Sequence, residues 1–180
     1  MKIDYSKYKT ILDVGCGQNP LPQATHYCDA YPDKNVSRGA DLNTKVIGKK
    51  EFKIANLDEG LPYKDKEFDW VHCDNVLEHV KDPIKCCKEL MRVSKAGYIC
   101  CPTNIWEVLF RRGYHKWTVS MEENKLIFTL KTEKNCPPNT FRGDDLFDEC
   151  TMFKETFKKN VHLFYVKFKW SNSFEVSVIK

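Results

Sequence analysis

Short runs of apolar and β-branched residues recur between positions 10 and 102 of the chain. They occupy residues 10–14, 25–28, 52–55, 68–73 and 97–102. Runs of this length, bounded by glycine, proline or charged residues, are typical of buried strands. The segments between them are long enough for crossover connections, so the pattern predicts an α/β domain built on a mostly parallel sheet.

A helical period follows the fourth of these runs. Its apolar positions are Ile84, Cys87, Leu90 and Met91. Spacings of three and four residues place these side chains on one face of a helix. Asp82 and Pro83 supply a cap and a first-turn proline, and Gly97 ends the pattern and begins the fifth run.

The C-terminal half has the pattern of two hairpins. Residues 117–120 and 126–130 flank the first polar turn, and residues 162–170 and 174–179 flank the second, Ser171-Asn172-Ser173. Alternating aromatic and β-branched residues in these arms are typical of strands. We expect the C-terminal hairpin to finish the sheet with antiparallel strands, and we expect a helix over residues 144–157.

The composition suits one domain over residues 1–180, with an inserted hairpin and loop at about 105–140. The chain has 180 residues, of which 42% are hydrophobic and 30% charged. Its first ten residues are polar, and it has no apolar run of about 18 residues, so we expect neither a secretory leader nor a membrane span. The net charge of +4 is mild, so a nucleic-acid partner is neither indicated nor excluded.

The nine cysteines include no Cys-x-x-Cys pair. Two pairs are adjacent instead, Cys86-Cys87 and Cys100-Cys101. Neighbouring side chains on a helix or strand point in different directions, which is a poor arrangement for binding a metal ion. We therefore expect reduced thiols, a cytoplasmic location and no metal site.

The first apolar run ends in the sequence Asp13-Val14-Gly15-Cys16-Gly17. Glycines after a buried strand let the backbone approach a ligand closely. A dinucleotide-binding domain would have a third glycine at position 20 and start a helix near it, but that residue is Pro20. An acid beside two glycines suits S-adenosylmethionine, which carries an ammonium group and has no phosphate.

Four stretches carry a family resemblance. They are LDVGCG, HYCDAY, LPYKDKEFDWVHCDNVLEHVKDP and LMRVSKAGYICCPT, which lie within residues 10–104. Their combination resembles the class I S-adenosylmethionine-dependent methyltransferases of the small type 11 kind. The resemblance implies a Rossmann-like fold with S-adenosyl-L-methionine as its cofactor.

The same resemblance implies a set of cofactor contacts near the ends of the strands. The set is Asp13, Gly15, Cys16, Gly17, Asp29, Asn56, Leu57 and Asp74. Asp29, at the end of the second strand, is expected to bind the ribose hydroxyls. Asn56 stands where the family often has an acid beside the adenine, and Asp58 is the alternative. Asn19 replaces the third glycine of the first motif, so we expect a loop or a short helix after the first strand.

Two histidines are the candidate catalytic residues. His79 follows the fourth strand, where the family places its acceptor, and His115 lies in the sequence Gly-Tyr-His-Lys-Trp beyond the fifth. A histidine can take a proton from a hydroxyl near neutral pH as the methyl group transfers. The alternative is that each histidine packs against the cofactor or caps backbone groups. Positioning and exclusion of water can also drive this reaction without a base.

The identity of the acceptor is open. Residues 73–76 read Cys-Asp-Asn-Val and lack the Pro-Pro-aromatic turn of enzymes that methylate exocyclic nitrogens. Thr103 and Asn104 stand where RNA ribose methyltransferases carry a lysine. We favour O-methylation of a small acceptor, such as a sugar or glycan hydroxyl. The alternatives are an RNA or protein methyltransferase and a catalytically silent cofactor-binding module. The oligomeric state stays open.

Overall fold

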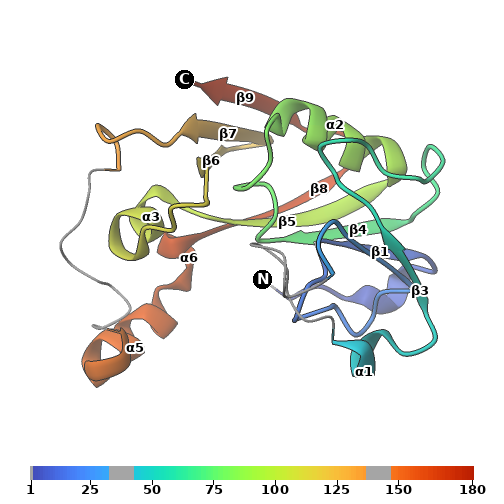
Figure 1. Ribbon diagram of the computed structural model, residues 1–180, viewed down its shortest axis with the longest axis horizontal. Helices are drawn as coiled ribbons and strands as arrows, with labels where there is room; N and C mark the ends of the chain where they lie inside the picture. Colours follow the sequence, from blue (N-terminus) through green and yellow to red (C-terminus); the bar gives the residue numbers. More distant parts are fainter. Residues whose placement is uncertain (1, 33–42, 137–146) are drawn as a thin grey trace.

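The computed structural model describes residues 2–32, 43–136 and 147–180 (Figure 1). Within these residues a central sheet of six strands has the order β3-β2-β1-β4-β5-β8. The strands are β3 (Glu51–Ile54), β2 (His26–Asp29), β1 (Ile11–Val14), β4 (Trp70–Asp74), β5 (Ala96–Pro102) and β8 (Tyr165–Ser171). The first five are parallel, and β8 is antiparallel to β5. The predicted α/β class with a mostly parallel sheet is confirmed.

Two details of the central sheet reflect local packing. β4 begins at Trp70, because Phe68 forms only an isolated bridge with Ser94. Gly97 belongs to β5, and a Cβ at this position would lie 2.6 Å from Val71 Cγ1 and 2.9 Å from Trp170 Nε1. A glycine is therefore required where β5 passes between its two neighbours, β4 and β8.

The predicted helix after the fourth strand is α2 (Pro83–Val93). The side chain of Asp82 caps it by accepting a hydrogen bond from the Lys85 backbone nitrogen at 3.0 Å, and Pro83 lies in the first turn. Its buried face carries Cys86, Cys87, Leu90 and Val93. The chain leaves the helix at Ser94 and enters β5 directly.

A second sheet of three strands has the order β6-β7-β9. The predicted hairpin forms from β6 (Trp117–Glu122) and β7 (Lys125–Leu130), which are antiparallel. β9 (Glu175–Ile179) lies parallel to β7. Apolar side chains of α2, β6 and β7 share one core with the central sheet. In Figure 1 this second sheet and α2 accordingly lie on the same side of the central sheet.

The expected C-terminal hairpin is wrong in its pairing. β8 and β9 both form, but β8 pairs with β5 and β9 pairs with β7. The turn between them has Asn172 at φ 64° and donates a hydrogen bond from the Asn172 nitrogen to Lys95 O. Phe174 then packs against Phe168 and Trp170, and its nitrogen lies 3.3 Å from Met91 Sδ. These contacts carry the chain across α2 to the second sheet.

The remaining helices are short. They are η1 (Tyr5–Lys7), α1 (Thr44–Ile47), α3 (Asn104–Phe110), α5 (Thr151–Lys159) and α6 (Val161–Phe164). Of the helix expected over 144–157, residues 144–146 lie outside the described residues. Residues 147–149 are helical, Cys150 is extended and caps a new helix, and α5 ends at Lys159, so the expected single helix is interrupted. Residues 15–25, all of which are described, form turns without a helix, as expected for the segment after the first strand.

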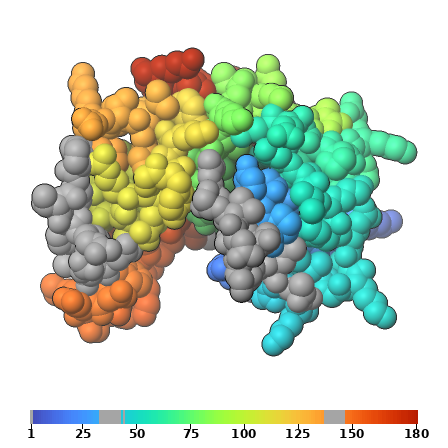
Figure 2. Space-filling view, in the orientation of Figure 1, coloured from blue at the N-terminus to red at the C-terminus, as the bar shows by residue number. Residues whose placement is uncertain are grey.

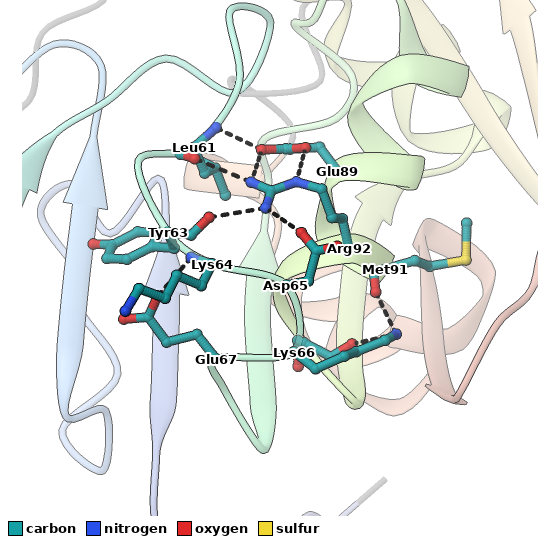
Figure 3. A network of polar contacts seen from close by, with 10 residues as sticks. Leu61, Tyr63, Lys64, Asp65, Lys66, Glu67, Glu89, Met91 and Arg92 are labelled. Atoms are coloured by element: carbon teal, nitrogen blue, oxygen red, sulfur yellow. Dashed lines mark hydrogen bonds and ion pairs between the residues drawn. The ribbon is translucent and has the colours of Figure 1, made fainter.

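A polar network joins α2 to the loop that leads into β4 (Figure 3). Arg92 donates to both carboxylate oxygens of Glu89 at 2.8 and 2.7 Å and to Asp65 Oδ1 at 2.8 Å. It also donates to the carbonyls of Tyr63 and Leu61 at 2.8 and 3.1 Å. All three guanidinium nitrogens therefore have acceptors, and the loop is held against the helix.

No helix among the described residues is long and apolar enough to cross a membrane.

Candidate active site

The glycine turn after β1 is tied to the end of β2. Gly15 and Gly17 have positive φ angles of 69° and 43°. The nitrogens of Gly15 and Cys16 both donate to Cys28 O, at 2.8 and 3.3 Å. The nitrogen of Gly17 donates to Asp29 Oδ2 at 3.0 Å. The turn therefore presents backbone and an oriented carboxylate at the same edge of the sheet.

Gly15 also passes close to the loop after β4. A Cβ at this position would lie 2.4 Å from Val76 Cγ2. A side chain at Gly15 would therefore push the first turn away from the fourth strand, and the positive φ would add backbone strain.

Three carboxylates lie at the carboxyl ends of neighbouring strands β2, β1 and β4. Asp29 Oδ1 accepts from the Tyr31 nitrogen at 2.8 Å, and the buried Asp13 accepts from the Leu21 nitrogen at 2.7 Å. Asp74 is exposed. Burial raises the pKa of Asp13 to about 7 against the hydrogen bond from Leu21, and the charges of Asp74 and Asp29 raise it further. This edge therefore favours a positively charged ligand.

The segment after β3 holds the other predicted cofactor contacts. Asn56 Oδ1 accepts from the Asp58 nitrogen at 3.0 Å, and its Nδ2 donates to Glu59 at 3.3 Å. Leu57 is buried. Asp58 Oδ1 accepts from the Lys81 nitrogen at 2.7 Å and so anchors the start of the α2 region. Asn56 and Asp58 both make local hydrogen bonds, so Asn56 stays our predicted adenine contact with Asp58 as the alternative.

The two candidate histidines lie side by side. The nitrogens of Lys116 and Trp117 donate to Glu78 O at 2.8 and 3.2 Å, which ties the start of β6 to the loop after β4. As a result the ring centroids of His79 and His115 are 4.7 Å apart. Figure 2 shows this meeting of segments, with the yellow residues of α3 and β6 against the green residues that follow β4.

His115 is oriented by a buried carboxylate that we did not anticipate. Its Nδ1 hydrogen-bonds to Glu107 of α3, and the second oxygen of Glu107 pairs with Lys131 Nζ. Lys131 also donates to Arg112 O at 2.8 Å, and Trp106 stacks on the imidazole at 5.4 Å. Burial tends to raise the pKa of Glu107, but the hydrogen bonds from His115 and Lys131 outweigh it and hold the pKa below its ordinary value.

Glu78 is the second residue that we did not anticipate. Its side chain is fully buried, and no described residue donates a hydrogen bond of normal geometry to either carboxylate oxygen. His79 Nε2 lies 3.8 Å from Glu78 Oε1. Burial raises the pKa of Glu78 to about 8, and the charges of Asp74 and Glu107 raise it further, against weak hydrogen bonding from its own backbone and from the Cys101 thiol.

The sequence contains a signal for one of these two acids, Glu107. Glu107 is the lone charged residue in the apolar stretch Asn-Ile-Trp-Glu-Val-Leu-Phe of α3. A buried acid needs a partner, so such a residue predicts a cation nearby. The cation is Lys131, which directly follows β7, and its identity depends on how the second sheet packs against α3.

A groove of about 630 Å³ opens at the same end of β5. Its wall includes Ile105 of α3, Val119 and Met121 of β6, and Leu163 and Val166 of the α6–β8 region. Its volume lies in the range of small-molecule sites. Its lining includes neither His79 and His115 nor the predicted cofactor contacts, so the groove is not the proposed site itself.

Comparison with known proteins identifies the family. Residues 12–101 match the sequence model of a family described as a methyltransferase domain, which is half of the chain. The chain belongs to this family. The resemblance to class I S-adenosylmethionine-dependent methyltransferases is thus confirmed.

Curated relatives of this methyltransferase-domain chain differ in what their names say they act on. Cycloartenol-C-24-methyltransferase 1 of Oryza sativa subsp. japonica is 32% identical over 111 residues, which cover 54% of this chain and 32% of the relative. The ubiquinone biosynthesis O-methyltransferase of Aromatoleum aromaticum is 31% identical over 98 residues, covering 47% and 40%. The chain spans about a third to a half of the length of the curated relatives it matches.

Among solved structures, an S-adenosylmethionine-dependent methyltransferase from Mesorhizobium loti is 11% identical, with a TM-score of 0.46 over 89% of each chain.

The family implies S-adenosylmethionine as the cofactor, and the residues at the strand ends fit it. The positive-φ glycine turn brings backbone close to a ligand, as described above. Asp29 keeps lone pairs for hydroxyl donors beside its two backbone hydrogen bonds. Asp13 and Asp74 add negative charge opposite a cationic ligand. The described residues at this edge thus offer carboxylate hydrogen-bond acceptors and closely approaching backbone, and they form no phosphate-binding loop.

Proposed function

We propose that this chain transfers a methyl group from S-adenosylmethionine to an oxygen atom of a small-molecule acceptor. The observation that supports this most directly is the glycine turn hydrogen-bonded to Asp29, beside the Glu78–His79–His115 cluster. A cofactor site and a polar acceptor site would then share one edge of the sheet, where open α/β sheets bind their ligands.

The cofactor supplies the methyl group on its sulfonium, already activated for transfer. In our proposal Asp29 accepts hydrogen bonds from the ribose hydroxyls, and Asp13 and Asp74 face the cationic amino-acid end. Gly15, Cys16, Gly17, Asn56 and Leu57 complete the cofactor contacts. The thiol of Cys16 serves as packing here, because burial raises its pKa to about 12 and keeps it neutral.

His79 and His115 contact the acceptor in this proposal, and one of them takes its proton. The hydrogen bond from His115 Nδ1 to Glu107 leaves Nε2 as the nitrogen that can face the acceptor. The pair Glu107–Lys131 holds this imidazole in place. Tyr114 stacks on His79 with centroids 5.6 Å apart and orients the second ring.

The acceptor class is a finer proposal. A sugar or glycan hydroxyl is our hypothesis from the sequence, while the sterol and quinone names of the relatives favour an acceptor with an apolar part. RNA and protein acceptors, and a silent binding module, are the alternatives.

We also propose that residues 1–180 form a single domain and that the protein works in the cytoplasm. The nine free cysteines support the cytoplasmic location, because thiols stay reduced there.

Two measurements test the proposal. Calorimetry should show S-adenosylmethionine or its demethylated product binding in the micromolar range and raising the melting temperature. Turnover should then be screened against nucleotide sugars, prenylated phenols, short RNA and peptides. Binding of NAD in place of either ligand would refute the assignment, and cofactor binding without any turnover would favour the silent module.

A further inference from the structure

We propose that Glu78, His79 and His115 form a binding site for one divalent transition-metal ion. The three residues offer a carboxylate oxygen and two imidazole nitrogens, and these atoms all lie within 4.8 Å of one another. In a tetrahedral zinc site with bonds of about 2.1 Å, ligand atoms are about 3.4 Å apart. Small side-chain rotations would therefore bring the three donors into ligand geometry.

Glu78 is the strongest argument for a cation at this point. It is fully buried, and neither carboxylate oxygen receives a hydrogen bond of normal geometry from a described residue. A buried carboxylate whose nearby positive group is one histidine at 3.8 Å is poorly compensated for its lost hydration. An ion bound between Glu78 and the two histidines would supply positive charge next to the buried carboxylate.

The surroundings of His115 are those of a metal-binding histidine. Such a histidine usually donates its second ring nitrogen to a carboxylate, which fixes the tautomer and turns the other nitrogen toward the ion. In this structure Glu107 holds His115 Nδ1, and Lys131 holds Glu107. The remaining nitrogen of His115 is therefore oriented by the buried Glu107 and, through it, by the partly buried Lys131.

The donor set indicates the kind of ion. Two histidines and one carboxylate suit zinc in catalytic sites and iron(II) in open sites, whereas magnesium and calcium prefer oxygen ligands. Three protein ligands leave at least one position for a further oxygen atom. The acceptor hydroxyl of the proposed reaction could occupy it, and the two histidines would then be ligands in place of proton acceptors.

The test is metal binding to the full chain, which requires no methyl transfer and so fails or succeeds independently of the proposed function. The chain is stripped with a chelator and titrated with Zn²⁺ in competition with a chromophoric chelator, and separately with Co²⁺. We expect one ion per chain and the visible absorption of a low-coordinate Co²⁺ site.

Four variants and one control locate the ion. Glu78→Gln, His79→Gln and His115→Gln should each weaken binding by at least about 100-fold, and Glu107→Gln by about 10- to 100-fold through the orientation of His115. The control His162→Gln removes an exposed histidine of α6 and should leave binding unchanged. Circular dichroism shows whether each variant is folded.

A second measurement keeps the proposal testable if a variant does not fold. In the unmodified chain, sub-stoichiometric Co²⁺ should shift or broaden the ring-proton resonances of two histidines and leave the other three sharp. No bound ion at micromolar Zn²⁺ and Co²⁺ would overturn the proposal. Binding that survives substitution of Glu78 and both histidines would overturn it as well.

Discussion

Two clusters of acids and bases in this chain have opposite electrostatic arrangements. Around Arg92, on the surface of α2, every guanidinium nitrogen has an acceptor, and both oxygens of Glu89 are bound. Around Glu78, in the interior, the carboxylate oxygens accept no hydrogen bond of normal geometry from the described residues. Both clusters connect a helix or strand to a loop that is distant in the sequence.

The contrast separates a structural network from a candidate functional one. A satisfied network fixes a loop and stabilises the fold, because each hydrogen bond compensates for lost hydration. An unsatisfied buried acid lowers stability, and a protein that keeps one has a use for it. Substitutions in the Arg92 cluster should therefore change stability, and substitutions in the Glu78 cluster should change activity.

The largest expected effect concerns the histidines. His79→Ala or His115→Ala should lower turnover on the true acceptor by about 10²- to 10⁴-fold, with cofactor affinity nearly unchanged. Arg92→Lys is the matched control and should keep turnover within about twofold. Steady-state kinetics with calorimetry measures both quantities. Near wild-type turnover in both histidine variants would remove them from the chemistry.

Chelation sharpens this prediction. If a histidine takes the acceptor proton directly, wild-type turnover should be insensitive to chelator. If the cluster binds an ion, removal of the ion should reproduce the loss seen in the histidine variants, and added Zn²⁺ should restore the rate.

The next effect concerns Asp29, on the cofactor side of the same edge. Asp29→Ala removes two expected charge-assisted hydrogen bonds to the ribose and should weaken S-adenosylmethionine binding by roughly 2 to 4 kcal/mol. The fold should persist, because Asp29 ends β2. Asp4→Ala, an exposed acid near the N-terminus, serves as the calorimetric control. Equal affinities of the two variants would place the ribose elsewhere.

A smaller effect is expected in the structural cluster. Arg92→Ala should lower the free energy of unfolding by about 2 kcal/mol, because it removes the hydrogen bonds of Arg92 to Glu89, Asp65 and the loop carbonyls and leaves Glu89 with only the Leu61 nitrogen as donor. Arg92→Lys keeps the charge and should lose about half as much. Urea unfolding gives both values. An Arg92→Ala variant as stable as wild type would show that the network contributes orientation without stability.

The smallest effect is a pH dependence in the same cluster. The hydrogen bond from Arg92 holds the pKa of Glu89 below its ordinary value of 4.5, although partial burial opposes this. The stabilisation is thus present above pH 4.5 and is lost as the pH falls through the lower pKa of the folded state. Glu89→Gln should cost about 1 kcal/mol at pH 7, and the difference from wild type should vanish in acid. A stability difference between wild type and Glu89→Gln that increases as the pH falls would contradict this prediction.

Local sequence patterns predicted the elements that depend on neighbours along the chain. The parallel strands follow from short apolar runs, the helix over Pro83–Val93 from its cap and period, and the glycine turn from residues 15 and 17. Asp29 at the end of β2 follows from the same reasoning. Each of these depends on backbone preferences and turn chemistry that a few consecutive residues carry.

Tertiary packing alone decided the partners of distant segments. β9 has the alternation of a strand, but whether it pairs with β8 or β7 depends on where Phe174 packs. The sequence proposed His79 and His115 separately, and only the attachment of β6 to Glu78 O places their rings in contact. Burial of Glu78 and the pairing of Glu107 with Lys131 depend on three elements meeting. No local pattern encodes such a meeting, because burial and charge pairing are properties of the packed interior and not of the strand or helix that supplies each residue.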